Sequence, residues 1–107
     1  MKKRGEVWWI NFDPALGQEI KKQRPAIIVS NDISNTFLNR YQEVPLSSQI
    51  QKLYPSETII KIGGKPCKAM ADQLTTVSIQ RFTRKIGEVK EDELKAVEKI
   101  IRMQLGL

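Results

Sequence analysis

The hydrophobic positions of this 107-residue chain fall into several short segments, followed by one longer segment at the C-terminus. Residues 5–12, GEVWWINF, are rich in β-branched and aromatic side chains, which predicts a strand. In a strand, Trp8 and Ile10 lie on one face, and Val7 and Trp9 lie on the other. Both faces of this strand carry bulky side chains. We therefore expect this strand to be covered on both sides or to lie at a subunit interface.

Further β-like segments share a short length, apolar side chains and flanking turn residues. They cover residues 25–30, 44–46, 58–62, 67–71, 74–77 and 85–89. The sequence GGKP separates two of them, 58–62 and 67–71, and indicates a hairpin. The polar stretch 31–40 indicates a loop or a short helix.

The C-terminal segment has a different period. Between residues 91 and 105 the apolar side chains form one stripe, made of Leu94, Val97, Ile100, Ile101 and Leu105. This spacing predicts an amphipathic helix. Three acidic residues open the segment, where the helix dipole favours negative charge, and Gly106 follows it as a helix stop.

Many short strands, turns rich in glycine and proline, and one terminal helix favour a mainly β fold. Such strands are best buried in a small, strongly bent antiparallel sheet or barrel with the helix packed on it. A chain of 107 residues supports one hydrophobic core. We therefore expect a single domain over residues 1–107.

The charge of the chain indicates a class of binding partner. The formal net charge is +6, and residues 1–87 hold 14 lysines and arginines against 7 aspartates and glutamates. A polyanion such as nucleic acid is the natural partner of this basic region. The alternative is a generic basic protein that its charge keeps in solution. The N-terminus lacks the long apolar stretch of a signal peptide, and no segment is long enough to span a membrane. We expect a cytoplasmic protein without membrane contact.

Missing residue types exclude several chemistries. The sequence has no histidine, which removes histidine metal sites, the Ser-His-Asp triad and the usual acid–base residue at neutral pH. Cys67 is the only cysteine, which excludes an intramolecular disulfide and a cysteine zinc site. Catalysis would have to use arginine, lysine, carboxylates or hydroxyls, or a metal held by oxygen ligands alone.

Arg24 and Pro25 are the first candidates for chemistry. Proline restricts the preceding residue to an extended backbone, so Arg24 is held where the chain enters a strand. A guanidinium on a fixed backbone can grip a phosphate through two hydrogen bonds and stabilise charge that develops at phosphorus. A surface arginine ahead of a strand is also common, so the motif alone decides nothing.

Three further candidates are polar. Ser47 and Ser48 end the stretch VPLSS, where a hydroxyl could hydrogen-bond a phosphate or assist proton movement. Serine pairs are also ordinary turn residues. Glu19 is a carboxylate among cations; it could orient Arg24, contact a substrate, or form a surface ion pair that contributes little.

Four sequence blocks carry a family resemblance through their order and spacing. They are GEVWWINFDPALGQE, KKQRPAIIVSND, VPLSSQI and ADQLTTVSIQRF. With the terminal helix, they resemble the MazF/PemK family of toxins from bacterial toxin–antitoxin systems, over residues 3–105. The resemblance implies a small SH3-like antiparallel β-barrel of the CcdB/MazF type, usually a homodimer. It also implies a sequence-specific endoribonuclease that cuts single-stranded mRNA and inhibits translation and growth, with no metal and no other cofactor.

The resemblance also assigns roles to residues. The arginine of the family's Arg-Pro motif falls on Arg24. The catalytic hydroxyl, normally a threonine, falls on Ser47, or on Ser48 if the register differs by one. Serine lacks the methyl that restricts the rotamer, so activity could be altered. Glu19 is the candidate general base. The residues expected to contact RNA are Gly17, Gln18, Lys21, Lys22, Asn31, Ser48, Gln49 and Gln73. The 2′-OH of the RNA would attack phosphorus, leaving a 2′,3′-cyclic phosphate and a 5′-OH.

A cognate antitoxin is the other partner that the resemblance implies, with an acidic, partly disordered tail that would neutralise the basic groove. Two other functions stay open. The first is a toxin of the same fold that poisons DNA gyrase. Toxins of that type end in Trp-Gly-Ile, whereas this chain ends in Gln-Leu-Gly-Leu. The second is a non-catalytic RNA-binding module that lost activity with the change from threonine to serine.

Overall fold

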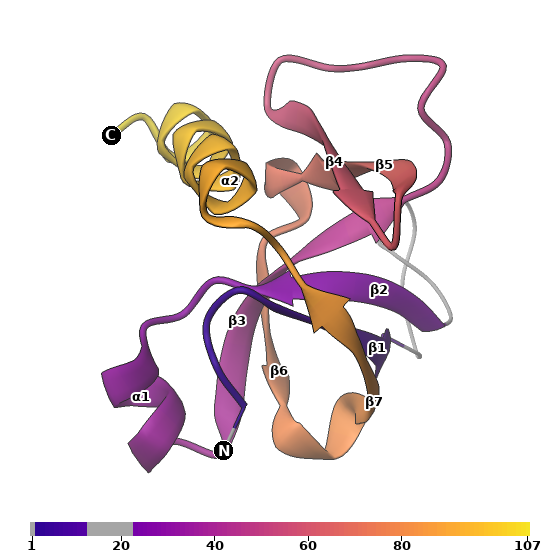
Figure 1. Ribbon diagram of the computed structural model, residues 1–107. Helices are drawn as coiled ribbons and strands as arrows, with labels where there is room; N and C mark the ends of the chain where they lie inside the picture. Colours follow the sequence, from indigo (N-terminus) through magenta and orange to yellow (C-terminus); the bar gives the residue numbers. More distant parts are fainter. Residues whose placement is uncertain (1, 13–22) are drawn as a thin grey trace.

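The computed structural model describes residues 2–12 and 23–107, and there the chain forms seven strands and a few helices (Figure 1). The strands are β1 (Glu6–Asn11), β2 (Gln23–Ile28), β3 (Arg40–Ser47), β4 (Glu57–Ile62), β5 (Lys65–Met70), β6 (Thr75–Ser78) and β7 (Phe82–Glu88). The helices are α1 (Asp32–Phe37), α2 (Glu91–Leu105) and the short 3-10 helices η1 (Ala71–Gln73) and η2 (Ile79–Arg81). The predicted succession of short strands followed by one terminal helix is confirmed.

All paired strands are antiparallel, in the order β4-β5-β3-β2-β1-β7, with β6 added on β3. The sheet bends around β3. The first half of this strand pairs with β6, its middle with β2 and its last two residues with β5. Two register shifts between β1 and β7 add the curvature that β-bulges produce. The sheet therefore curls into a half-barrel, with β4 and β5 on the side of α2 (Figure 1).

Both faces of the curled sheet are packed. On one face lies the main core, which includes Val7 of β1, Ile27 of β2 and Val97 of α2, all fully buried. On the other face Ile10 of β1 belongs to a smaller cluster, against which Trp8 packs. β1 contributes to both clusters, which explains why both of its faces carry bulky side chains. The chain itself thus buries Val7 on one face and Ile10 on the other, while Trp8 and Trp9 are only half-buried.

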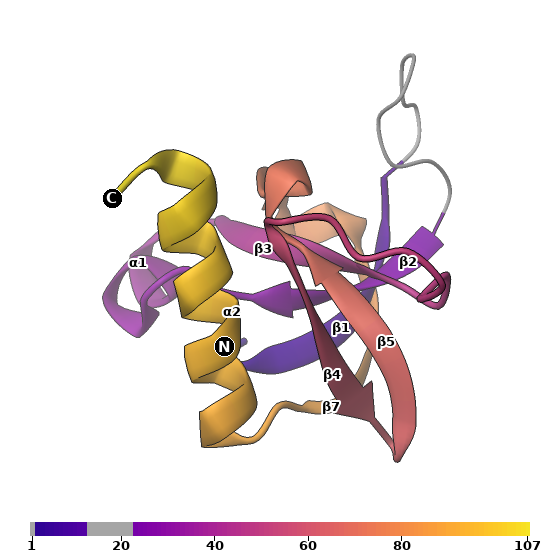
Figure 2. The ribbon, with the colours of Figure 1, turned by 90° about the horizontal axis from the view of Figure 1, so that it is seen from above.

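The terminal helix α2 lies beside β4 and packs on the main core (Figure 2). It begins and ends where the sequence predicts. Glu93 accepts a hydrogen bond from the Lys90 N–H at 3.2 Å through Oε1, and one from the Lys61 N–H of β4 at 2.7 Å through Oε2. At the other end, Gly106 has a left-handed φ of 71°, and its N–H reaches back to the Arg102 carbonyl.

The predicted hairpin is also confirmed. β4 and β5 pair along their full length, starting with Glu57 opposite Met70. Gly63 and Gly64 form the connection with φ values of 59° and 81°, a conformation that favours glycine and suits a two-residue hairpin turn. The hairpin places β5 beside the end of β3.

β3 is longer than the predicted segment 44–46. Arg40 and Gln42 are exposed while Tyr41 and Glu43 are buried, so the strand alternates between its two faces. The buried series contains a carboxylate, and this hides the apolar period on which a strand prediction depends.

β2 begins at Gln23, two residues before the predicted start at Pro25. Pro25 lies opposite Trp9 of β1, while the ladder with β3 begins only at Ala26. Among the described residues, Pro25 thus has a strand neighbour on one side only, and a residue without an N–H is tolerated there. Because β2 begins at Gln23, Arg24 lies inside the strand.

Candidate active site

Arg24 lies in β2, opposite Ile10 of β1. Its side chain is half-buried, and its Nε is buried with no hydrogen-bond partner among the described residues. A buried donor without a partner is unfavourable in a folded protein. The Nε of Arg24 thus lacks a partner among the described residues, and a guanidinium has further N–H groups through which it can bind an anion.

Ser47 is the last residue of β3 and is 7% exposed. Its Oγ accepts a hydrogen bond from the Gln49 N–H at 3.1 Å, which forms the turn that leaves the strand. A serine hydroxyl also has one proton to donate. No residue in the described part of the chain accepts that proton.

Arg24 and Ser47 lie on the same face of the sheet and at the same end of it. Ala26 faces Pro45 across the ladder between β2 and β3. Two residues further along each strand are Arg24 and Ser47, and residues two apart on a strand share a face. Both residues lie just beyond the last paired residues of the ladder between β2 and β3, so the alternation puts their side chains on one face at the same end of the sheet.

Ser48 and Gln49 follow in the loop to β4, and both are exposed. Ser48 comes after the end of β3, and the alternation of a strand would direct it away from the face that holds Arg24. By this alternation Ser47, and not Ser48, shares the face of Arg24. Gln73 ends η1, is half-buried, and belongs to a helix that contacts β3.

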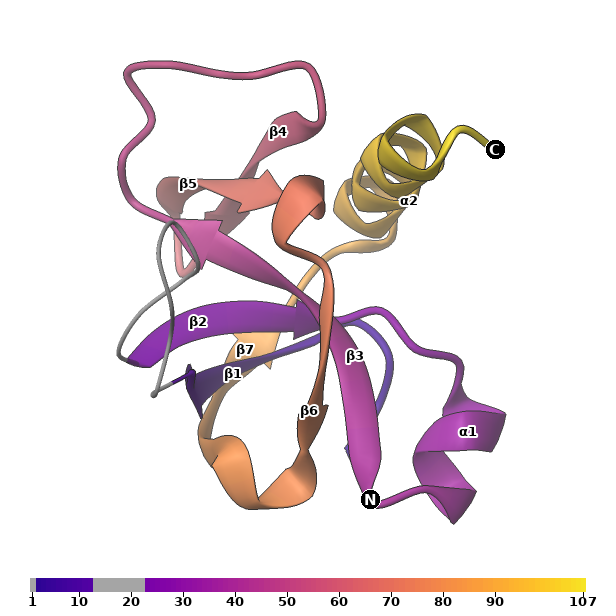
Figure 3. The ribbon, with the colours of Figure 1, turned by 180° about the vertical axis from the view of Figure 1, so that it is seen from behind.

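Asn31 lies apart from these residues. It is the N-cap of α1, and its Oδ1 accepts a hydrogen bond from the Ser34 N–H at 2.8 Å. It follows the end of β2, whereas Arg24 lies near the start, and seven residues of extended chain span about 20 Å. Figure 3 shows α1 at the start of β3 and the β4–β5 hairpin at the other end of that strand. The structure gives Asn31 a capping role and does not bring it to Arg24.

Five candidates lie outside the described residues: Gly17, Gln18, Glu19, Lys21 and Lys22. The substrate-binding role of this segment stays a prediction, and so does the assignment of Glu19 as a general base. Their sequence position directly precedes β2 and Arg24.

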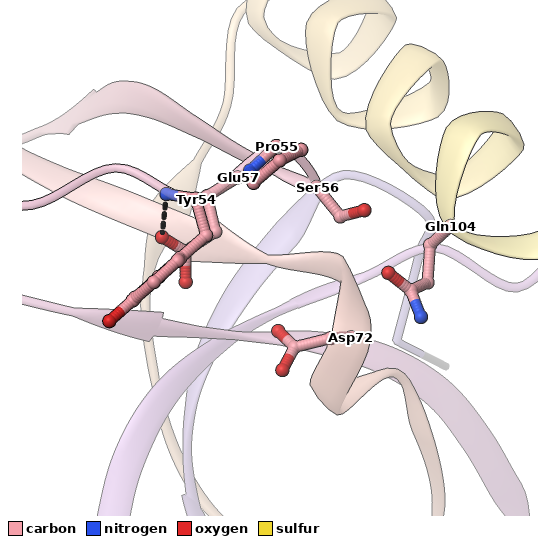
Figure 4. Close-up of a pocket in the computed structure, with 6 residues that line it drawn as sticks. All are labelled: Tyr54, Pro55, Ser56, Glu57, Asp72 and Gln104. Atoms are coloured by element: carbon pink, nitrogen blue, oxygen red, sulfur yellow. Dashed lines mark hydrogen bonds between the residues drawn. The ribbon is translucent and has the colours of Figure 1, made fainter.

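A buried ion pair beside Ser47 is a feature that the sequence analysis missed. Lys68 faces Ser47 across the ladder between β3 and β5, and its Nζ lies 2.9 Å from Glu57 Oε1. Glu57 also accepts a hydrogen bond from the Tyr54 N–H at 2.8 Å (Figure 4). The pocket drawn there is lined by Tyr54, Pro55, Ser56, Glu57, Asp72 and Gln104. The sequence signal is weak, because lysine and glutamate on hairpin strands are ordinarily exposed.

Glu43 of β3 was missed as well. It is fully buried, and neither carboxylate oxygen has a hydrogen-bond partner within residues 2–12 and 23–107. Burial raises the pKa of Glu43 to about 9, because the charged form loses its hydration. The side chain is therefore a neutral acid at pH 7. Four residues of extended strand, about 13 Å, separate it from Ser47, so it is no part of the site.

Two kinds of feature are missing from the described ranges. No group of three histidine, cysteine, aspartate or glutamate side chains gathers there in a way that could hold a metal ion. No helix in that part of the chain has the length and hydrophobicity to cross a membrane.

Known proteins place the chain in a family. The family model for PemK-like, MazF-like toxins of type II toxin-antitoxin systems matches residues 3–105. Endoribonuclease MazF9 of Mycobacterium tuberculosis (strain ATCC 25618 / H37Rv) is 35% identical over 116 residues, covering 100% of this chain and 98% of the relative. The crystal structure of MazF (Form-I) from Deinococcus radiodurans is similar with a TM-score of 0.87 at 26% identity, over 99% of this chain and 97% of that one. An endoribonuclease in complex with its cognate antitoxin, from a mycobacterial species, shares the fold with a TM-score of 0.84 at 19% identity, over 100% and 97%. The chain therefore belongs to the family of PemK-like, MazF-like toxins of type II toxin–antitoxin systems.

Proposed function

We propose that this chain is a sequence-specific endoribonuclease that cuts single-stranded mRNA and thereby inhibits translation and growth. The observation that carries the proposal is the placement of Arg24 and Ser47 on one face and at one end of the sheet. The 35% identity to a protein named as an endoribonuclease supports it. The net charge of +6 suits a polyanionic substrate.

RNA supplies the nucleophile in this reaction. The 2′-oxygen attacks phosphorus and loses its proton, the bond from phosphorus to the 5′-oxygen breaks, and that oxygen takes up a proton. The products are a 2′,3′-cyclic phosphate and a 5′-OH. Arg24 stabilises the negative charge that grows on the phosphoryl oxygens, because its guanidinium offers several N–H donors in one plane. The protein contributes mainly positioning and charge stabilisation.

Ser47 donates its hydroxyl proton to a non-bridging phosphate oxygen or orients the sugar. In a threonine the methyl group would restrict the rotamer. In this chain the Gln49 N–H holds the Ser47 Oγ at 3.1 Å. The turn after β3 supplies part of the restriction that the absent methyl would give, so serine at this position is compatible with catalysis.

The base that takes the 2′ proton is not a histidine, since the sequence has none. We assign this role to Glu19, on its place in the sequence just ahead of β2. Contacts to the RNA are assigned to the loop residues Gly17, Gln18, Lys21 and Lys22, and to Ser48, Gln49 and Gln73.

The partners follow from the family. We assign a cognate antitoxin, because the family consists of toxins of toxin–antitoxin systems and a structural neighbour is an endoribonuclease bound to its antitoxin. An acidic segment would complement the basic charge of this chain. A homodimeric state, a cytoplasmic location and independence of metal ions are further parts of the proposal.

Cleavage of a long RNA in the presence of EDTA tests the proposal. Wild-type protein should cut at a small set of sequences, and Arg24→Ala should be slower by about 10²–10³-fold. Arg40→Ala is the matched control, because Arg40 is exposed at the opposite end of β3 from Ser47. Equal rates for wild type and Arg24→Ala would contradict the role of Arg24. No cleavage by wild-type protein would favour a gyrase poison or an RNA-binding module.

A further inference from the structure

We propose that Lys68 and Glu57 are positioning residues that hold the loop after Ser47 in one conformation and thereby set which RNA sequences are cut. The loop consists of residues 48–56. This role rests on the proposed endoribonuclease function and adds a determinant of its sequence preference. The observation behind this proposal is the buried ion pair, which has no part in the cleavage reaction itself.

The ion pair is buried in a hairpin that does not need it. The two side chains are 10% and 6% exposed, and Lys68 Nζ lies 2.9 Å from Glu57 Oε1. Removing two charges from water is unfavourable, and a well-packed apolar pair often stabilises a structure as well or better. The pairing of β4 with β5 therefore does not explain why charged residues occupy these two buried positions. The other contacts of Lys68 and Glu57 explain it.

Both members of the pair bind the backbone of the loop. Lys68 Nζ donates to the Lys52 carbonyl at 3.0 Å. Glu57 Oε1 accepts from the Tyr54 N–H at 2.8 Å, as Figure 4 shows. Lys68 Nζ also lies 5.3 Å from the centre of the Tyr54 ring. The Lys52 carbonyl needs a hydrogen-bond donor, which the Lys68 ammonium supplies, and the Tyr54 N–H needs an acceptor, which the Glu57 carboxylate supplies. The pair thus supplies the hydrogen-bond partners that this backbone would otherwise find in a sheet.

The anchored loop begins at the proposed catalytic hydroxyl. Ser47 faces Lys68 across the ladder between β3 and β5, and the Gln49 N–H binds Ser47 Oγ. The loop is therefore fixed at its start by Ser47 and towards its end by the ion pair. A nucleotide next to a phosphate bound at Ser47 would lie beside this loop.

The exposed side chains of the loop suit the recognition of bases. Gln49 and Gln51 offer amide donors and acceptors, and Tyr54, 53% exposed, offers a ring for stacking. Single-stranded RNA is recognised through hydrogen bonds to unpaired bases and through stacking on aromatic rings. Recognition is stronger when these groups are already ordered, because ordering them on binding is unfavourable. The anchors at Lys52 and Tyr54 provide that order.

The test measures cut-site preference in variants that break the anchor. Lys68→Met removes the ammonium group and keeps the length of the side chain. Glu57→Gln keeps the size of the side chain and removes the charge, which breaks the ion pair with Lys68 and weakens the hydrogen bond from the Tyr54 N–H. Lys61→Met is the matched control, because it removes a cation from an exposed position of the same hairpin. The ends of all fragments from one long RNA are sequenced, and hydrogen exchange of the loop amides is followed in the protein alone.

We expect both anchor variants to cut at additional sequences. The preference for the best wild-type site over sites that differ by one base should fall about tenfold. The Tyr54 amide should exchange at least about tenfold faster, while Lys61→Met should match wild type in both measurements. Because Glu57→Gln is nearly isosteric, it carries the test if Lys68→Met does not fold.

The double variant Lys68→Glu/Glu57→Lys separates a loop anchor from a pair that only stabilises the hairpin. It restores opposite charges but places a donor where the Tyr54 N–H needs an acceptor. A loop anchor predicts that the broadened preference persists. Recovery of the wild-type preference would overturn the proposal, and so would an unchanged preference in the folded single variants. If wild-type protein cuts no RNA, the proposed function fails together with this inference. If wild-type protein cuts RNA and the folded variants keep its preference, only this inference fails.

Discussion

Replacement of Glu43 by glutamine should remove the loss of stability that the wild type shows as the pH rises from about 5 to 8. The wild-type carboxyl is fully buried and has no hydrogen-bond partner among the described residues. Burial raises its pKa to about 9, from an ordinary value of 4.5. Above pH 4.5 the folded state therefore holds a proton that the unfolded state releases.

The sign and the size of the effect follow from this difference. The stabilisation from protonated Glu43 is complete below pH 4.5 and is lost as the pH rises toward 9. Each pH unit within this window lowers the free energy of unfolding by about 1.4 kcal/mol. Between pH 5 and pH 7 the wild type should lose about 3 kcal/mol through this group, which is a large part of the roughly 5–15 kcal/mol that stabilises a typical domain. Glutamine has no charge to desolvate, so Glu43→Gln should lack this slope.

Urea unfolding at pH values from about 5 to 8 measures the difference directly. Glu91→Gln is the control, because Glu91 is an exposed carboxylate in the first turn of α2, and this variant should keep the wild-type slope. Parallel pH profiles for wild type and Glu43→Gln would refute the reasoning. They would mean that Glu43 is hydrated or paired in the folded protein.

Three further changes test other parts of the structure. Ser47→Ala should slow single-turnover cleavage by about 10²-fold, and Ser47→Thr should restore the rate because the hydroxyl is kept; equal activity of Ser47→Ala and wild type would remove Ser47 from the mechanism. Ile27→Ala should lower the free energy of unfolding in urea by about 3 kcal/mol, because Ile27 is fully buried in the main core. A change below about 1 kcal/mol would contradict this packing. Asn31→Ala should cost about 1 kcal/mol of stability through the lost helix cap and leave RNA cleavage unchanged, whereas slower cleavage by the folded variant would place Asn31 at the substrate.

Local sequence signals were sufficient where the physical cause lies within a few residues. The helix α2 follows from the apolar stripe and the acidic first turn, and Gly106 ends it through a left-handed backbone that glycine favours. The β4–β5 hairpin follows from two adjacent glycines between two short segments with apolar side chains.

Features that depend on pairing between distant strands could not be predicted in this way. The bulky side chains on both faces of β1 left two explanations open, and only the curled sheet shows that Val7 and Ile10 belong to two different clusters within one chain. Lys68 and Glu57 resemble ordinary surface residues in the sequence, and they become a buried pair because the hairpin folds beside β3 and under the loop. Glu43 concealed the start of β3 for the same reason: its burial is set by β2 and β6, which lie on either side of it.

The candidate site was predicted partly from chemistry and partly from family resemblance. Chemistry selected Arg24 and the hydroxyls of Ser47 and Ser48 as groups that could act on a phosphate. The common face of Arg24 and Ser47 depends on the register of β2 with β3, which no local pattern encodes. Asn31 was expected to contact RNA under the family resemblance; its amide oxygen caps α1, and a contact with RNA stays a prediction.

The most direct test of the account is cleavage of a short RNA that contains one preferred cut site, compared with the same RNA carrying a single 2′-deoxynucleotide on the 5′ side of the scissile phosphate. With EDTA present, wild-type protein should cut the first RNA to a 2′,3′-cyclic phosphate and a 5′-OH and leave the second intact, and Arg24→Ala should cut the first about 10²–10³-fold more slowly. Equal cleavage of the two RNAs, or an unchanged rate in Arg24→Ala, would contradict the claim that Arg24 promotes attack by the RNA's own 2′-OH.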